Sequence, residues 1–276
     1  MKLPRSSYYK RGSEEARRVR EESRTTLRGA IEDVVAEWPA YGYRRVTQEL
    51  RRRELVANHK RVAKLMREEA LTPRRVKKFL STTDSAHALP VLPNLAQGFL
   101  PTRQNQLWVA DITYIRLRTD FAFLSVVLDA WSRKVVGYAI GKALGTRLTL
   151  SALEAAVAAR RPSPGLIHHS DRGSQYAAKE YRERLDQLGI RGSMGRKGNP
   201  YDNAYAESFF KTLKQEEIYA YEYKTMGDVA ERLPRFLEEV YNRRRLHSAL
   251  GYVPPEEYEL KYTRLESQSP GVQLST

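Results

Sequence analysis

The spacing of apolar residues changes about a third of the way along the chain. Between residues 26 and 80 apolar positions recur every three to four residues, which predicts short helices. Trp38-Pro39 and a brief turn at 55–57 separate them. The predicted helices span 27–37, 43–53 and 58–70. This spacing suits a helix-turn-helix, so the first part is expected to be an all-helical N-terminal domain.

Beyond residue 104 the pattern predicts strands as well as helices. Three strand-like runs come first, and short strands then alternate with helices, which predicts an α/β fold with a mixed sheet of five strands flanked by helices. The predicted strands are 107–117, 121–131, 134–140, 166–169 and 190–194. The predicted helices are 146–160, 174–188, 202–217 and 226–242, the last interrupted at Pro234. The expected domains are 1–80, a proline-containing linker at 81–103, a core at 104–222, and a C-terminal helical extension and tail at 223–276.

Basic residues are concentrated in the first part of the chain. The net charge is +15, and residues 1–80 hold 22 Lys and Arg against 11 Asp and Glu, whereas the remaining residues hold 26 against 22. In the third predicted helix, Asn58 can cap the first turn while Val62, Leu65 and Met66 form an apolar stripe. Four basic residues lie outside that stripe and are candidates for DNA contact: Lys60, Arg61, Lys64 and Arg67. A solvated basic face on a helical bundle is the alternative for each of them.

Composition narrows the possible chemistry. The chain has no cysteine, so any metal must be held by carboxylates or histidines, which favours hard cations. There is no run of about eighteen apolar residues and no apolar segment near the start that resembles a signal peptide, so we expect a cytoplasmic protein without a membrane partner. We find no phosphate-binding loop. No tyrosine has the acidic and basic neighbours that a tyrosine nucleophile requires.

Three carboxylates stand out by their predicted structural positions. Asp111 lies within an apolar strand, where an unpaired charge is costly to bury. Asp171 follows a short apolar strand, and Gly173 permits a sharp turn into the next helix. Glu207 lies early in a helix, so one turn of helix can direct it inward. These three residues are the candidate catalytic and metal-binding acids.

The blocks around these acids carry a family resemblance. His169-Ser170-Asp171-Arg172-Gly173-Ser174-Gln175-Tyr176 and the block 198–209, GNPYDNAYAESF, resemble insertion-sequence transposases of the retroviral-integrase superfamily. Thirty-five residues separate Asp171 from Glu207, the interval by which that superfamily's two later acids are identified. Further matching blocks are 127–133, VLDAWSR, and RLHSALGY near the end. The likeness covers roughly residues 26–260 and is strongest with the second-reading-frame protein of bacterial IS-three-type elements.

The resemblance implies a ribonuclease-H-like core that cleaves and joins DNA strands at insertion-sequence ends. It implies two Mg²⁺ ions, roughly 4 Å apart and replaceable by Mn²⁺, with Asp111 bridging them and Asp171 and Glu207 completing one site each. The implied partners are terminal inverted repeats, target DNA, further copies of the chain, and the upstream reading-frame product as a frameshift fusion. A non-catalytic DNA-binding regulator or accessory subunit is the alternative from another class, and a ribonuclease of the same fold is a third.

Residues around the acids have two interpretations each. Lys211 and Lys214 share a helix face with Glu207 and either touch DNA or form an ordinary surface pair. His169 has the strand parity of Asp171 and is a better supporting candidate than His168. Asn203 either hydrogen-bonds near the site or caps its helix. Asp129 is expected to support a turn. Arg243, Arg245 and His247 belong to a late basic cluster that contacts DNA phosphates or forms a solvated helix end.

Overall fold

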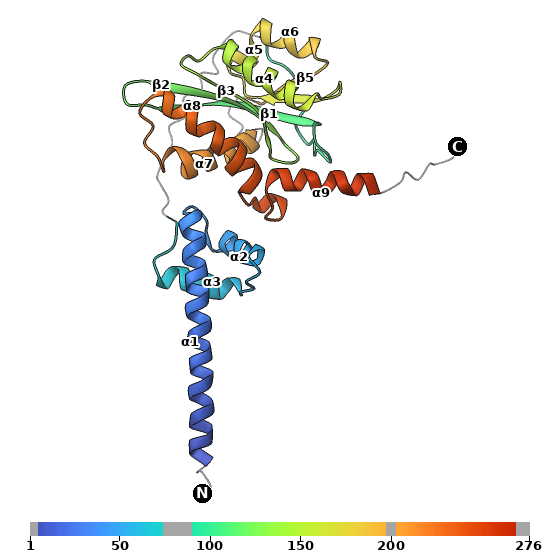
Figure 1. Cartoon of the computed structure of the whole chain (residues 1–276). Coiled ribbons are helices and arrows are strands. Elements are labelled where there is room, and N and C mark those ends of the chain that lie inside the picture. Colours follow the sequence, from blue (N-terminus) through green and yellow to red (C-terminus); the bar gives the residue numbers. More distant parts are fainter. Residues whose placement is uncertain (1–4, 74–89, 197–202, 269–276) are drawn as a thin grey trace, which may run out of the picture. The chain divides into compact units, whose positions relative to one another are not determined.

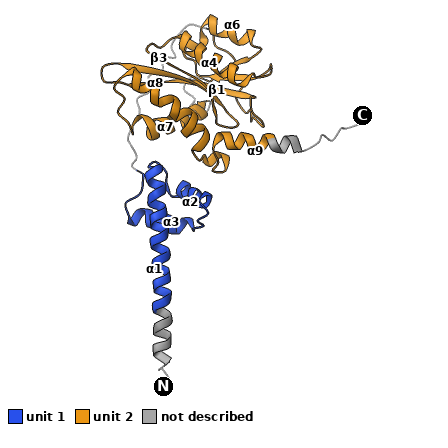
Figure 2. Cartoon of the chain, in the orientation of Figure 1, with its two compact units in different colours: residues 1–75 blue, residues 76–276 orange. Residues whose placement is uncertain are grey.

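The chain divides into two compact units. The computed structural model describes residues 5–73, 90–196 and 203–268. Unit 1 is formed by residues 1–75 and unit 2 by residues 76–276 (Figure 2). None of the described helices is both long enough and apolar enough to cross a membrane.

Unit 1 is helical, as predicted, but its first helix is much longer than the apolar pattern indicates. Its helices are α1 (Arg5–Glu37), α2 (Tyr43–Arg52) and α3 (His59–Glu68). The predicted start of α1 at residue 27 is wrong because residues 14–26 are exposed and have no apolar stripe. Good helix formers and pairs such as Arg18–Glu22, 3.4 Å apart, support this stretch instead.

The core of unit 1 forms where the three helices meet. Asn58 caps α3 by accepting a hydrogen bond from the Lys60 backbone N–H at 2.8 Å, as predicted. The apolar side chains that fill this core are Leu27, Ile31, Val34, Val46, Leu50, Val62, Leu65 and Met66. All four candidate DNA-contacting residues of α3 are exposed: Lys60, Arg61, Lys64 and Arg67.

Unit 2 contains the predicted five-stranded mixed sheet. Its strands are β1 (Leu107–Arg116), β2 (Phe121–Asp129), β3 (Val135–Gly141), β4 (Ile167–Ser170) and β5 (Arg191–Met194). They lie in the order β3-β2-β1-β4-β5. The first three pair antiparallel, whereas β4 runs parallel to both β1 and β5. The acids of β1 and of the turn after β4 are therefore carried on neighbouring parallel strands.

Helices cover both faces of the sheet (Figure 1). One face carries α4 (Thr146–Arg160), α5 (Ser174–Ala177) and α6 (Lys179–Gln187). The other carries α7 (Ala204–Leu213), α8 (Met226–Arg235) and the π-helices η2 (Lys214–Ile218) and η3 (Phe236–Arg244). Helix α4 approaches β3 so closely that a Cβ on Gly137 would lie 2.5 Å from the Ala152 carbonyl oxygen. The interruption predicted at Pro234 is a change from α- to π-helix at Phe236.

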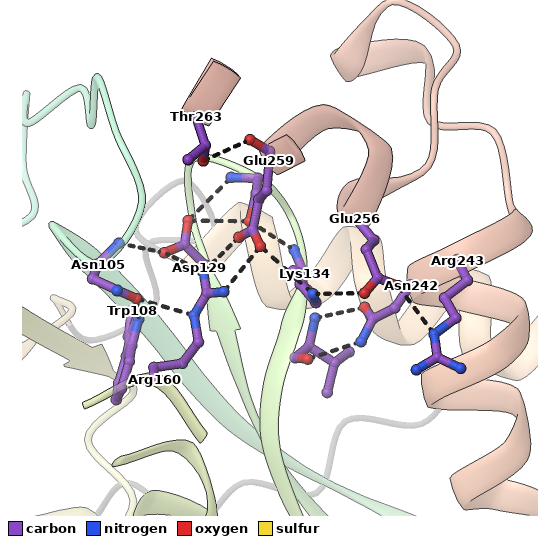
Figure 3. Close-up of polar contacts among 12 residues, drawn as sticks. Asn105, Trp108, Asp129, Lys134, Arg160, Asn242, Arg243, Glu256, Glu259 and Thr263 are labelled. Atoms are coloured by element: carbon purple, nitrogen blue, oxygen red, sulfur yellow. Dashed lines mark hydrogen bonds and ion pairs between the residues drawn. The ribbon is translucent and has the colours of Figure 1, made fainter. Parts of the chain in front are cut away.

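The last helix, α9 (Pro255–Gln268), follows a short 3₁₀ turn, η4 (Ser248–Leu250). Figure 3 shows the polar network that attaches it to the sheet. Glu259 pairs with the Arg160 guanidinium, with Nη1 and Oε2 2.9 Å apart, and lies 3.6 Å from the Lys134 ammonium. The Trp131 ring packs against two tyrosines of α9. Helix α9 is therefore joined to the sheet of unit 2 through buried charged groups and aromatic packing.

Part of the segment predicted as a linker lies against unit 2. Leu92, Leu95 and Phe99 pack against the two apolar layers of the sheet. The Leu95 backbone N–H donates to the Ser193 hydroxyl at 2.9 Å, which connects this segment to β5. The segment from residue 90 onward is thus held by contacts that its proline-rich sequence does not indicate.

Candidate active site

Asp111 is half-buried in the middle of β1 on the sheet face that α7 covers. Apolar neighbours at the same strand parity, such as Val109 and Ile115, pack into the core beneath that helix. One carboxylate oxygen accepts a hydrogen bond from the Ile112 backbone N–H at 2.7 Å. The other accepts one from the Asn203 side-chain amide at 2.9 Å. Both oxygens of Asp111 are therefore oriented by the protein.

Asp171 immediately follows β4 at the carboxyl end of that strand. Because Ala110 pairs with Ser170 in the parallel register, the next residue along each strand is an aspartate. The Gly173 backbone N–H donates to one Asp171 carboxylate oxygen at 2.9 Å. A Cβ on Gly173 would lie 3.0 Å from that same oxygen, so the glycine permits this close turn. The two aspartates thus lie on neighbouring strands, at the point where β4 ends.

Glu207 comes to the same region on α7. The buried side of this helix consists of Ala206, Phe209, Phe210 and Leu213, which pack against the sheet. Glu207 itself is exposed, and its negative charge acts on Asp111. The charges of Asp171, at the end of β4, and of Glu207, on α7, therefore both act on Asp111.

The electrostatics of this region favour a bound cation. Burial, followed by the charge of Asp171 and, more weakly, that of Glu207, raises the pKa of Asp111 to about 8. Burial also lowers the pKa of the Lys214 ammonium to about 8, although the charge of Asp111 opposes this shift. Gathered carboxylates repel one another, and a divalent cation relieves that repulsion.

The residues present suit a hard cation. Carboxylate oxygens are the ligands that Mg²⁺ and Mn²⁺ prefer, and Mg²⁺ is commonly bound by one or two carboxylates plus water and phosphate oxygens. Within residues 5–73, 90–196 and 203–268, no three His, Cys, Asp or Glu side chains are close enough to hold one ion. Asp111 and Asp171 directly follow two residues that are paired across neighbouring strands, and their charges interact, as does that of Glu207 with Asp111.

Two predicted supporting residues have defined partners. Asn203 does not cap α7 with its side chain but donates to Asp111, which decides between the two interpretations of this residue. His169 is buried, and its Nδ1 lies 2.8 Å from the Ser193 hydroxyl on β5. His168 points to the opposite face, where its Nε2 lies 3.1 Å from the Tyr181 hydroxyl.

The basic residues predicted to touch DNA differ in their surroundings. Lys211 is exposed on α7, whereas Lys214 is buried in η2, with its ammonium 5.6 Å from the centre of the Tyr114 ring. Arg243 is exposed and pairs with Glu256 at 3.0 Å. Arg245 is buried, and its two hydrogen bonds to the Glu216 carboxylate are 2.6 and 2.7 Å long. Arg245 therefore forms a buried ion pair and is not exposed for DNA contact. The sequence did not indicate this pair, because the two partners are 29 residues apart.

Tyr176 was not among the predicted site residues, but the charges of Asp111 and Asp171 act on it. Its side chain is fully buried on α5. Burial raises the pKa of Tyr176 well above its usual value, and the nearby Tyr181, Asp111 and Asp171 add to the shift. The available signal was its position one helical turn beyond Gly173 in the block that follows Asp171. The Tyr176 hydroxyl therefore stays protonated at neutral pH.

We expect His168 to make unit 2 less stable in mild acid. Burial, together with the neighbouring His169, lowers the pKa of His168 from 6.5 to about 4. As the pH falls below 6.5, His168 therefore becomes protonated in the unfolded chain, but in the folded chain it stays neutral until about pH 4. Stability from this residue is fully present above pH 6.5 and is lost as pH falls toward 4, by about 3 kcal/mol.

Urea unfolding at pH 7 and pH 4.5 measures this effect. The wild-type chain and a His168→Gln variant are compared, because glutamine does not titrate. The contributions of all other titrating groups to the free energy of unfolding are shared by both proteins and cancel when the two are subtracted. The variant is expected to lose clearly less free energy of unfolding between the two pH values. Equal losses in both proteins would contradict the assignment.

Comparisons with known proteins identify the type of fold. An integrase core domain matches residues 101–200, a second integrase core domain model matches 188–255, and an HTH-like domain matches 21–79. Among solved structures, a chain of the simian T-cell lymphotropic virus intasome in complex with PP2A regulatory subunit B56 gamma is similar in fold, with a TM-score of 0.50 at 17% identity. That alignment covers 80% of this chain and 69% of that one. Unit 2 is thus a ribonuclease-H-like integrase core, the fold of polynucleotidyl transferases.

Curated relatives specify the family. The chain is 42% identical to the insertion element IS600 uncharacterized 31 kDa protein of Shigella sonnei, covering 82% of this chain and 83% of the relative. It is 37% identical to the transposase for insertion sequence element IS904 of Lactococcus lactis, covering 79% and 87%. It is 38% identical to transposase InsF for insertion sequence IS3A of Escherichia coli K12, covering 80% and 77%. The protein belongs to the IS3-type family of insertion-sequence transposases and is a polynucleotidyl transferase.

Proposed function

We propose that this transposase cuts and joins DNA strands at insertion-sequence ends, with Asp111, Asp171 and Glu207 as its catalytic acids. The observation that carries the proposal is the pair of aspartates on adjacent parallel strands, next to Glu207 on α7. Hydrolysis by water frees a 3′-hydroxyl at the element end. That hydroxyl then attacks a phosphodiester of a second strand, forms a new phosphodiester with its 5′ phosphate and releases the 3′-hydroxyl of that strand, so the same site serves both steps.

The same three residues would hold two Mg²⁺ ions, or Mn²⁺ in their place. Asp111, Asp171 and Glu207 would supply the carboxylate oxygens that hold these ions. When bound, the ions supply an activated oxygen nucleophile and offset the charge that develops on the leaving oxygen.

The remaining residues of the site orient these carboxylates and offset part of their negative charge. Asn203 and the Ile112 N–H fix the rotation of the Asp111 carboxylate, and the Gly173 N–H does the same for Asp171. The buried ammonium of Lys214 places positive charge near Asp111. His169 stabilises the end of β4 through Ser193 and so positions Asp171 two residues later.

DNA is the proposed partner of both units. In unit 1 the exposed basic side of α3, formed by Lys60, Arg61, Lys64 and Arg67, would contact terminal repeats. In unit 2 Lys211, exposed one turn after Glu207, would contact phosphates beside the acids. Arg243, near the end of η3, would contact phosphates only after its ion pair with Glu256 breaks. Two element ends must be held at once, so we propose a homo-oligomer, assembled with the upstream reading-frame product as a fusion.

A strand-cleavage and strand-joining assay tests the proposal. The purified chain is incubated with end-labelled element DNA and Mg²⁺, and cleaved and joined products are separated by length. The proposal predicts both products from the wild-type chain and neither from acid variants that still bind DNA. Binding without any product from the wild-type chain would favour the rival function, a DNA-binding regulator or accessory subunit.

A further inference from the structure

A basic pocket lies at the end of the sheet opposite the acids. It has a volume of about 360 Å³ and is open to solvent. Strands β1, β4 and β5 all begin beside it, because Ile167 and Arg191, which are paired in the sheet, both line it. Asp111 lies four residues beyond the start of β1, which corresponds to roughly 13 Å along the strand. The pocket is thus separate from the carboxylate site but on the same sheet.

Positive charge dominates this pocket. Arg103, Arg161 and Arg191 line it and are exposed, and none of the lining residues that the structure describes is acidic. None of the three has an ion-pair partner within the part of the chain that the structure describes. The carboxyl end of α4 also lies here, but its partial negative charge of about half a unit offsets only a fraction of three full positive charges.

The backbone that carries the arginines is held firmly. The Gln106 side-chain oxygen accepts hydrogen bonds from the Thr102 and Arg103 backbone N–H groups, at 2.7 and 3.2 Å. The Arg161 N–H donates to the Val157 carbonyl oxygen at 2.8 Å. The Arg191 N–H donates to the Leu166 carbonyl oxygen, also at 2.8 Å. Each arginine therefore projects from a fixed anchor.

The charge network of Figure 3 supports the wall of this pocket. Asn105 lines the pocket, and its backbone N–H donates to the Asp129 carboxylate at 2.7 Å. Its side-chain oxygen accepts from the Arg160 Nε at 3.2 Å. Asn105 adopts a left-handed backbone conformation, with φ of 61°, which these two contacts stabilise. The loop before β1 is consequently preorganised rather than adaptable.

We propose that this pocket binds backbone phosphates of the DNA on which the transposase acts, at a point away from the cutting site. Guanidinium groups match phosphate oxygens in a bidentate, planar geometry, and three of them suit successive phosphates better than one small anion. The charged groups that line this open pocket are all arginines, and contacts between arginine and phosphate carry no base-sequence information. This inference rests on the proposed function, since it assumes a DNA substrate, but it does not depend on the three acids.

The salt dependence of DNA binding tests this inference. The full chain is titrated with a duplex of arbitrary sequence in EDTA at several salt concentrations, and the slope of log affinity against log salt is measured. The variant Arg103→Gln/Arg161→Gln/Arg191→Gln is expected to have a slope about two to three smaller in magnitude than wild type, because each phosphate contact contributes about 0.9. The matched Arg→Lys triple variant, which keeps the charges, is expected to restore most of that slope.

A control triple separates this site from a general charge effect. Lys179, Arg184 and Arg235 lie on the same unit, and each pairs with its own glutamate. Changing these three to Gln removes the same charge, and we expect a nearly wild-type slope. The inference is overturned if the pocket variant keeps the wild-type slope or if the control triple lowers it equally. Cleavage by acid variants is measured separately, so failure of the proposed function would leave this slope result intact.

Discussion

Replacing Asp111 by Asn is expected to lower the rate of DNA strand cleavage by at least about 1,000-fold. The substitution keeps the shape of the side chain and removes the charge that would hold the cations. A 1,000-fold lower rate corresponds to the loss of about 4 kcal/mol of transition-state stabilisation by the bound cations. Asp171→Asn and Glu207→Gln are expected to have effects of similar size. Cleavage of end-labelled element DNA in Mg²⁺ measures each rate.

The control for these variants is Asp120→Asn. Asp120 is an exposed aspartate in the turn between β1 and β2, so its substitution makes the same chemical change away from the site. Its cleavage rate is expected to match wild type, and all variants are expected to bind DNA normally. An Asp111→Asn protein that cleaves at the wild-type rate would remove this residue from the mechanism.

The substitution Glu259→Gln is expected to reduce the free energy of unfolding of unit 2 by about 3 kcal/mol. Glu259 is buried and pairs with Arg160, whose side chain is 14% exposed, so its loss leaves a largely buried guanidinium without its main partner. Breaking a buried ion pair from one side typically costs about 3–5 kcal/mol. Asp129, 4.0 Å from the same guanidinium, compensates partly, which places the expected value at the lower end.

Hydrogen exchange of backbone amides in β2 and β3 measures this loss within unit 2. The matched control is Glu183→Gln in α6, whose partner Lys179 lies 3.5 Å away with both side chains mostly exposed. An exposed pair contributes about 0–1 kcal/mol, so this variant is expected to resemble wild type. Equal opening free energies for Glu259→Gln and wild type would show that the network does not hold α9 to the sheet.

Much of unit 2 was predictable from the alternation and run length of apolar residues. Strands β1 to β5 lie within about two residues of the predicted ranges, because each buries at least one face. Helix α1 was not predictable in the same way, since residues 14–26 are exposed and have no apolar stripe. Helix α9 is attached by charged and aromatic groups, which a search for apolar periodicity does not detect.

The candidate site was predictable as a set of residues but not as a set of contacts. The positions of Asp111, Asp171 and Glu207 in predicted elements, together with the family resemblance, selected them from 33 acidic residues. That Asn203 contacts Asp111 and does not cap α7 depends on the packing of α7 over β1. The burial of Arg245 against Glu216 likewise follows from the fold alone, because a run of basic residues has no visible partner in the sequence.

The basic pocket could not be predicted, because three separate segments form it. Arg103 precedes β1, Arg161 follows α4, and Arg191 begins β5. Their proximity depends on the parallel pairing of β1, β4 and β5, because parallel strands begin at the same end of the sheet.

The position of Mn²⁺ in crystals of this protein, identified by its anomalous X-ray scattering, tests most directly whether these carboxylates bind the cations. We expect Mn²⁺ within coordination distance of both Asp111 and Asp171, and loss of that signal in crystals of Asp111→Asn. A fully occupied Mn²⁺ bound elsewhere, with none at these two carboxylates, would contradict this expectation.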